Sequence, residues 1–276
     1  MADLSLPPVL SADEAARIDN AVWGDVRWYL DGSDGRAAFE AEHIAGAIFV
    51  DMDLHLADHS AVGEGRHPMP SAAAFAASLG QLGIGPGDPV IAYDDRQGVP
   101  AGRMVWMLRA IGHEAALLDG GLDAWGGDRS TGVQTRPATS YPSVAWPDRL
   151  TDADATAAHG ASPRAVVIDA RAGDRFRGET EPMDAQAGHI PGAINLPYAA
   201  NLDDSGRFLP ADQLRQRFVD AGVADAEVVV NYCGSGVSAC HNLLAMERAG
   251  LGAAKLYPGS WSAWSSDPAR PVATGE

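Results

Sequence analysis

Short apolar runs alternate with longer amphipathic stretches along the chain, and glycine or proline separates most of them. In the second half, Ala165–Ile168, Val228–Tyr232 and Ala253–Tyr257 are predicted strands, because each is a short apolar run between turn residues. The longer stretches Ala211–Ala221 and Val237–Ala249 are predicted helices. This alternation predicts an α/β fold, a parallel sheet with helices on both faces.

The two halves of the chain repeat one another at a nearly constant spacing. Four segments recur 139 to 146 residues later: Leu10–Glu14 as Leu150–Asp154, His43–Ala47 as His189–Ala193, Val90–Tyr93 as Val229–Tyr232, and Gly120–Trp125 as Gly259–Trp264. In the first pair, Ser11 and Thr151 are predicted helix N-caps, since each has an acidic residue three positions later. We therefore expect two homologous domains, residues 1–127 and 148–276, joined by a linker rich in Gly, Thr, Ser and Pro at 128–147.

Composition and charge limit the partners of this chain. Hydrophobic residues make up 46% of it, but no apolar run approaches the ~18 residues that a membrane span needs. No basic cluster precedes the apolar stretch Leu4–Leu10, unlike a secretory signal, so we expect a cytoplasmic protein without a membrane partner. The net charge of −17 opposes nucleic-acid binding. Because residues 128–276 hold 13 of the 20 basic residues, we expect a small anionic ligand there.

The strongest chemical signal follows the predicted strand Val228–Tyr232, where the sequence reads Cys233-Gly-Ser-Gly-Val-Ser238. In an open parallel sheet, ligands bind beyond the carboxyl ends of the strands. Two glycines allow such a loop to point successive N–H groups at an anion, which favours the thiolate of Cys233. Phosphatases with a similar loop need an arginine six residues after the cysteine, and Ala239 stands there. The only other cysteine, Cys240, is too close and too solitary for a disulfide framework or a zinc site, so we expect neither a metal nor a cofactor.

Taken together, this loop, the upstream His189-Ile-Pro-Gly-Ala193, the downstream Pro258–Trp264 and the second copy in front resemble a tandem-domain rhodanese. More narrowly, the loop is similar to that of 3-mercaptopyruvate sulfurtransferases. The resemblance implies two rhodanese-like domains and a Cys233 that carries sulfur as a persulfide to an acceptor thiol or cyanide. In the first copy Asp94 stands where Cys233 stands in the second, so only the second copy is expected to be catalytic.

The resemblance also implies a Ser–His–Asp relay beside the cysteine. Ser235 matches the serine, His67 the histidine and Asp53 the acid, with Asp51 as a rival for the acid role. A histidine near neutral pH suits a proton transfer to a departing enolate. Considered without the resemblance, His67 is more simply a solvated loop histidine.

A donor carboxylate is expected to bind two arginines, since guanidinium forks hold carboxylates bidentately. Arg175 matches the first, but the segment 181–186 that should supply the second contains no arginine, which leaves Arg177 or Arg207 as substitutes. The loop residues Gly234, Gly236, Val237 and Ser238 complete the expected donor site.

Two functions remain open at this point. The first is a sulfurtransferase that takes sulfur from a small anionic donor and passes it to a thiol acceptor such as thioredoxin or a small thiol. The neutral Gly234 and Ser235 favour 3-mercaptopyruvate over the dianion thiosulfate, whereas the missing arginine argues the other way. The second is a sulfur-carrier or regulatory module that turns over no small donor.

Overall fold

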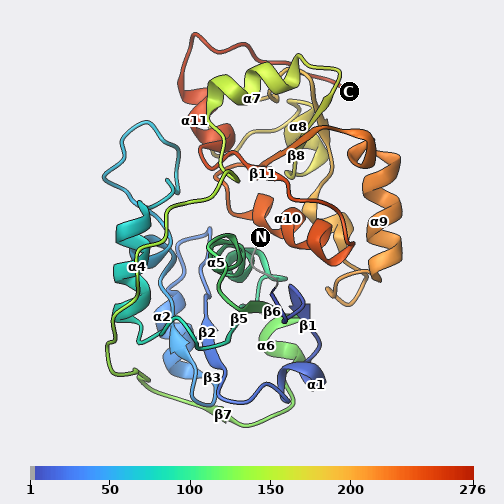
Figure 1. Cartoon of the computed structure of the whole chain (residues 1–276). Coiled ribbons are helices and arrows are strands. Elements are labelled where there is room, and N and C mark those ends of the chain that lie inside the picture. The colour runs from blue at the N-terminus through green and yellow to red at the C-terminus, as the bar shows by residue number, and fades with distance from the viewer. Residues whose placement is uncertain (1–3) are drawn as a thin grey trace. The chain divides into compact units, whose positions relative to one another are not determined.

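The computed structural model describes residues 4–276, which pack as two compact units (Figure 1). Unit 1 holds the chain up to Asp58 together with Pro70–Pro147 and Ser205–Arg207. Unit 2 holds His59–Met69, Asp148–Asp204 and Phe208–Glu276. These units differ from the domains expected at 1–127 and 148–276 in three segments, and the segment 59–69 matters most for the site.

Unit 1 is built on a parallel sheet whose five described strands lie in the order β1-β6-β5-β2-β4, with a two-stranded antiparallel ribbon β3-β7 beside it. Both faces of the sheet are covered, because Trp23 packs against the Phe39 and Leu122 core while Gly24 faces Met104 of α5. The elements are β1 Val9–Leu10, α1 Ala12–Ala15, β2 Val22–Asp25, α2 Gly35–Ala41, β3 His43–Ile44, β4 Ile48–Phe49, α3 Met52–His55, α4 Ala72–Gln81, β5 Val90–Tyr93, α5 Val99–Ala110, β6 Ala115–Leu118, α6 Gly121–Ala124 and β7 Arg129–Ser130.

Unit 2 repeats this plan, with four described strands in the order β11-β10-β8-β9, all parallel. One face carries a core built from Val230, Tyr232 and Trp261, and α10 packs on the other, with α9 beside it (Figure 1). The elements are α7 Ala153–Gly160, β8 Ala165–Asp169, α8 Gly173–Phe176, β9 Ala193–Asn195, η1 Tyr198–Asn201, α9 Ala211–Asp220, η2 Val223–Asp225, β10 Val228–Tyr232, α10 Ser238–Arg248, β11 Lys255–Leu256 and α11 Ser260–Ser266.

The predicted elements of unit 2 are confirmed, although β11 is shorter than the predicted run at Ala253–Tyr257. Of the two predicted helix starts, Ser11 forms the expected capping box with Glu14. The prediction for Thr151 was wrong, because Asp152 caps α7 instead. The reason is tertiary: Leu150 bridges to Leu256, and the Thr151 N–H bonds to the Leu256 carbonyl, which draws Thr151 into the sheet.

The stretch expected to be a linker, 128–147, packs along unit 1. Its first residues form β7, the Thr139 N–H donates to the Gly80 carbonyl at 2.9 Å, and the Trp146 indole donates to the Pro70 carbonyl at 2.9 Å. Segments without regular secondary structure can still be held firmly by such bonds to backbone carbonyls. The stretch therefore belongs to unit 1 by its contacts.

The repeated His-Ile motif has the same structure in both units. His43 stacks on Phe39 and bonds to its carbonyl, and His189 does the same with Phe176. In each unit the N–H of the isoleucine that follows the histidine donates to the hydroxyl of the tyrosine that ends the central strand. The two histidines thus hold the turn that precedes β4 or β9.

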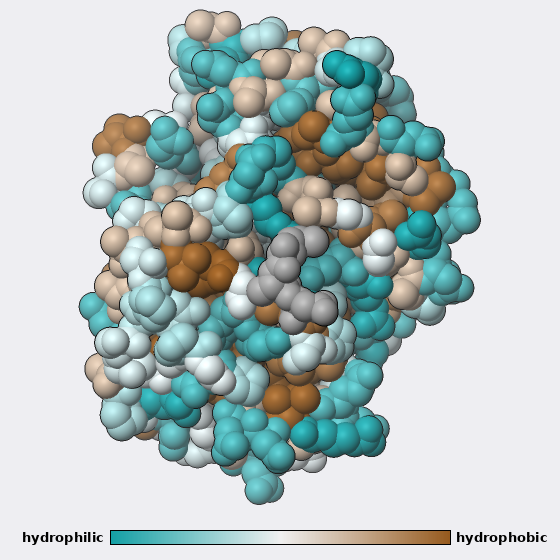
Figure 2. Space-filling view, in the orientation of Figure 1, coloured by the Kyte–Doolittle hydropathy of each residue, from teal (hydrophilic) through white to brown (hydrophobic). Residues whose placement is uncertain are grey.

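The face of the molecule seen in Figure 2 mixes polar residues, in teal, with apolar residues in several separate brown patches. No helix within residues 4–276 is both long enough and apolar enough to cross a membrane.

Candidate active site

Cys233 is held at the carboxyl end of β10 by bonds to both of its peptide groups. Its N–H donates to the Ser260 hydroxyl at 3.1 Å, and its carbonyl accepts from the Trp261 N–H at 2.9 Å. Its Sγ accepts a hydrogen bond from the Gly236 N–H at 3.1 Å, and the residue is 2% exposed. A backbone N–H directed at a sulfur stabilises negative charge there. The loop between β10 and α10 therefore contributes directly to the chemistry expected of Cys233.

The two loop glycines are needed for different reasons. Gly236 has φ +74°, and a Cβ there would lie 2.6 Å from the Pro258 carbonyl oxygen. Gly234 has no unusual φ, but a Cβ there would lie 2.7 Å from Nη2 of Arg66. Gly236 is thus required by the backbone, whereas Gly234 leaves room for a neighbouring guanidinium.

Ser260 supports the Cys233 loop through hydrogen bonds, and the sequence did not predict this role. It adopts φ 52°, its Oγ accepts the Cys233 N–H, and its hydroxyl donates to the Tyr257 carbonyl at 2.9 Å. A non-glycine residue in the left-handed region costs free energy, so the surrounding bonds must hold it there. The only signal was its place in the repeated Gly-Ser-Trp segment. Trp261 and Trp264, in the same segment, are core residues of unit 2.

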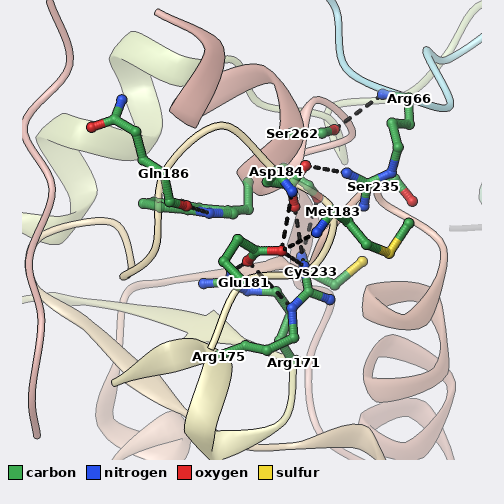
Figure 3. A network of polar contacts seen from close by, with 12 residues as sticks. Arg66, Arg171, Arg175, Glu181, Met183, Asp184, Gln186, Cys233, Ser235 and Ser262 are labelled. Carbon is green, nitrogen blue, oxygen red and sulfur yellow. Dashed lines mark hydrogen bonds and ion pairs between the residues drawn. The ribbon is translucent and has the colours of Figure 1, made fainter. Parts of the chain in front are cut away.

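His67 and Ser235 meet in unit 2, because the segment 59–69 packs there. His67 Nδ1 lies 2.8 Å from Ser235 Oγ, and both residues are buried. The preceding residue anchors the segment, since the Arg66 N–H donates to Ser262 Oγ at 3.0 Å (Figure 3). His67 is therefore not the solvated histidine that its loop position suggested.

The two candidate acids lie at the start of α3 in unit 1. Asp51 is the N-cap, and its Oδ1 accepts from the N–H groups of Asp53 and Leu54. Asp53 Oδ2 accepts from the Trp28 indole at 3.3 Å. Asp51 thus has a structural role as a helix cap, and the role of Asp53 in a relay stays a prediction.

A row of charged side chains of alternating sign runs beside the Cys233 loop, and Figure 3 shows the part of it from Arg171 to Arg66. Each member is ion-paired with the next, in the order Asp169, Arg171, Glu181, Arg175, Asp184, Arg66. Three acids face three arginines, so the row is neutral as a whole. Buried charges of this kind need such pairing to offset their lost hydration.

The pKa values along the row follow from burial and pairing. Burial raises the pKa of Asp184, and the nearby Arg66 only partly opposes this. Burial would also raise the pKa of Glu181, but hydrogen bonds from Arg175 and from two backbone N–H groups outweigh it and hold that pKa below its ordinary value. Glu181 is therefore the firmer anion of the two.

The arginines suggested as substitutes have other contacts. Arg177 forms a two-pronged pair with Glu179, at 2.8 and 2.9 Å, on the surface of unit 2. Arg207 packs with unit 1, near Gly120. Arg175 pairs with Glu181 at 2.7 Å and with Asp184 at 3.1 Å. Sequence reasoning missed Arg66 altogether, because a single arginine in a loop carries no signal of its own.

The first copy of the loop is occupied by its own side chain. Asp94 follows β5 as Cys233 follows β10, and its carboxylate accepts from the N–H groups of Arg96, Gly98 and Ala101 at 2.8 to 2.9 Å. Complete burial nevertheless raises the pKa of Asp94 to about 6, against the lowering effect of these bonds. The loop of the first unit thus holds a carboxylate group in place of sulfur.

Among residues 4–276, no group of three or more His, Cys, Asp or Glu side chains could hold a metal ion.

Comparison with known proteins places these observations in a family. The rhodanese-like domain matches residues 11–128 and again residues 152–267. The SseB protein of Mycobacterium tuberculosis, whose name proposes a thiosulfate sulfurtransferase, is 44% identical over 91% of this chain and 90% of its own length. A Pseudomonas aeruginosa protein, whose name proposes a 3-mercaptopyruvate sulfurtransferase, is 42% identical over 91% and 92%. The solved 3-mercaptopyruvate sulfurtransferase of Leishmania major superposes with a TM-score of 0.82 and 32% identity, over 95% of this chain and 76% of that one.

Proposed function

The chain belongs to the rhodanese family, with two rhodanese-like domains, and from this premise we propose that it is a sulfurtransferase that carries sulfur on Cys233. The observation that carries the proposal is the Gly236 N–H directed at the Cys233 Sγ, at the carboxyl end of the central strand. An N–H in this position stabilises the negative charge that the sulfur carries during transfer. Asp94 removes that nucleophile from the first copy.

With 3-mercaptopyruvate as donor, the Cys233 thiolate attacks the donor sulfur. A sulfur–sulfur bond forms, the donor carbon–sulfur bond breaks, and its electron pair remains on the carbon as the enolate of pyruvate. The thiol proton of the donor passes through Ser235 and His67 to that carbon, which yields pyruvate and the Cys233 persulfide. The 2.8 Å contact between these two residues supports this relay.

The donor site consists of the loop and the arginine beside it. In this proposal the loop residues Gly234, Gly236, Val237 and Ser238 line the donor site, where the Gly236 N–H bonds to the Cys233 sulfur, and Arg175 offers its guanidinium to the donor carboxylate. The pair between Arg177 and Glu179 supports only a peripheral role for Arg177. We favour 3-mercaptopyruvate over thiosulfate. The row of paired acids and arginines beside the loop has no net charge, so it suits a monoanion better than a dianion.

In the second half of the cycle, an acceptor thiolate attacks the outer sulfur of the persulfide and restores the Cys233 thiolate. A small thiol or a thioredoxin fits this chemistry, and cyanide serves as a simple substitute. The alternative function, a sulfur carrier without donor turnover, has the same persulfide but no fast exchange.

A single-turnover experiment with intact-mass detection tests the proposal. The protein is mixed with 3-mercaptopyruvate or thiosulfate without acceptor, and then with a thiol acceptor. We expect the mass of one sulfur atom to appear on the Cys233 peptide and to leave on addition of the thiol. A loaded Cys233 that does not exchange supports the carrier, and no loading with either donor contradicts both functions.

A further inference from the structure

Arg66 is the last member of the charged row, and nothing in the sequence marks it as part of the site. The resemblance leads one to expect two arginines for the donor carboxylate, and the segment 181–186 supplies Asp184 but no arginine. In the structure, the Asp184 side chain is only 3% exposed and pairs on one side with Arg175 and on the other with Arg66. A carboxylate that bridges two guanidinium groups holds them side by side.

Both guanidinium groups lie close to the cysteine loop (Figure 3). A Cβ on Gly234 would be 2.7 Å from Nη2 of Arg66 and 3.7 Å from Nη1 of Arg175. Gly234 directly follows Cys233, so both nitrogens lie beside the residue next to the nucleophile. Arg66 and Arg175 thus approach the loop together, although the chain separates them by more than a hundred residues.

The hydrogen bonding of Arg66 is incomplete. Its Nη1 is engaged by Asp184, but its Nε is buried and has no hydrogen-bond partner among the described residues. A buried donor without a partner costs free energy, so the Arg66 guanidinium is held by Asp184 without a full set of bonds. The Arg66 side chain is 28% exposed, so part of it remains open to solvent.

We propose that Arg66 and Arg175 together bind the carboxylate of the sulfur donor, with Asp184 as the shared counter-ion that aligns them. This inference rests on the proposed function and extends it to the residue that selects the donor. Arg66 replaces the arginine that the segment 181–186 lacks. Since Asp184 and Glu181 already balance the two guanidinium charges, a monoanionic carboxylate adds less uncompensated charge to the site than a dianion would.

Donor kinetics test the proposal. We expect Arg66→Ala to lower kcat/KM for 3-mercaptopyruvate about 10- to 100-fold, mainly through KM, because charge-assisted bonds to the carboxylate are lost. With mercaptoacetone, which lacks the carboxylate, the variant should match the parent protein. The matched control is Arg164→Ala, since Arg164 is an exposed arginine of unit 2 that pairs with Glu227 on the surface. Equal losses with both donors, or no loss with 3-mercaptopyruvate, would overturn the assignment.

A second measurement does not depend on turnover. Iodoacetate and iodoacetamide both alkylate Cys233, but only iodoacetate carries a carboxylate. We expect Arg66→Ala to lower the ratio of the two rates about tenfold, whereas Arg164→Ala leaves it unchanged. An unchanged ratio in Arg66→Ala contradicts the role of Arg66 even if sulfur transfer is normal. If no donor loads the parent protein, the proposed function fails while the ratio still reports on Arg66.

Removal of Arg66 leaves the carboxylate of Asp184 with one partner fewer, which could destabilise the segment. The double variant Arg66→Ala/Asp184→Asn removes that buried charge, and we expect the same loss of carboxylate selectivity in it. Arg66→Lys keeps the positive charge but loses the two parallel N–H donors of the guanidinium. Compared with Arg66→Ala, it should therefore recover only part of the carboxylate selectivity. Full selectivity in the double variant would contradict the proposal.

Discussion

His67 Nδ1 lies 2.8 Å from the hydroxyl of Ser235, a residue 168 positions further along the chain. Both side chains are buried in unit 2, and Ser235 stands two residues after the candidate nucleophile. A histidine in this position can exchange a proton with the donor through the serine hydroxyl.

Replacement of His67 by Ala should slow 3-mercaptopyruvate turnover by roughly 10²–10⁴, the usual contribution of a general acid–base residue. Thiosulfate turnover should fall far less, because sulfite leaves as a stable anion without a proton. The measurement is the ratio of variant to parent rates with each donor and the same acceptor. Equal losses would mean that His67 only shapes the site, and a negligible loss with 3-mercaptopyruvate would contradict the relay.

Cys233→Ser should abolish sulfur transfer without unfolding the protein, because the loop is held by backbone bonds and by Gly236. Cys240 is the matched control. It is buried in α10, and its thiol donates to the Gly236 carbonyl at 3.3 Å. Cys240→Ala should therefore retain most of the activity. Assays with a common acceptor and thermal unfolding of both variants check this, and an inactive but stable Cys240→Ala would mean that the wrong cysteine was assigned.

Gly236→Ala should affect both stability and activity, whereas Gly234→Ala should affect donor binding alone. Alanine at 236 must adopt a left-handed conformation, at a cost of about 1–2 kcal/mol, and also meets the Pro258 carbonyl, so both stability and activity should fall. Alanine at 234 meets only the flexible end of Arg66, so stability should hold while KM for 3-mercaptopyruvate rises. Denaturant unfolding together with steady-state kinetics separates the two effects. Equal destabilisation by both changes would refute this distinction.

Asp94 should make stability depend on pH. Its pKa is raised from 3.8 to about 6 in the folded protein, chiefly by burial, so folding favours its protonated form. The contribution of protonated Asp94 to the free energy of unfolding is therefore fully present below about pH 4, and it is lost as the pH rises through about 6. A shift of about two units corresponds to about 3 kcal/mol.

Asp94→Asn cannot titrate, so it isolates this contribution. The free energy of unfolding of the parent protein minus that of the variant should fall between about pH 4 and pH 7. Urea unfolding at several pH values measures the difference. A difference that is constant with pH, or that grows as the pH rises, would show that folding does not raise the pKa of Asp94.

The repeat and the apolar periodicity were enough to predict two α/β units and most elements of unit 2. These features are local or recur at a fixed spacing, and burial of the apolar residues leaves few alternative folds. The Cys233 loop could also be located, because its glycines, the strand before it and the helix after it are contiguous in the chain. The helix start at Thr151 was mispredicted, because the hydrogen bond that the Thr151 N–H donates to the Leu256 carbonyl competes with the local capping signal.

Only the tertiary structure decided which distant side chains join that loop. The segment 59–69 belongs to the first half by sequence, but its contacts with Ser235, Ser262 and Asp184 place it in unit 2. Arg66 carries no local signal, since a single arginine in a loop is usually solvated. Its place beside Arg175 follows from the buried carboxylate of Asp184, which must be paired with cations wherever the chain can supply them. The sequence by itself therefore determined the fold and the candidate nucleophile, and the three-dimensional pairing of buried charges decided which arginines stand beside it.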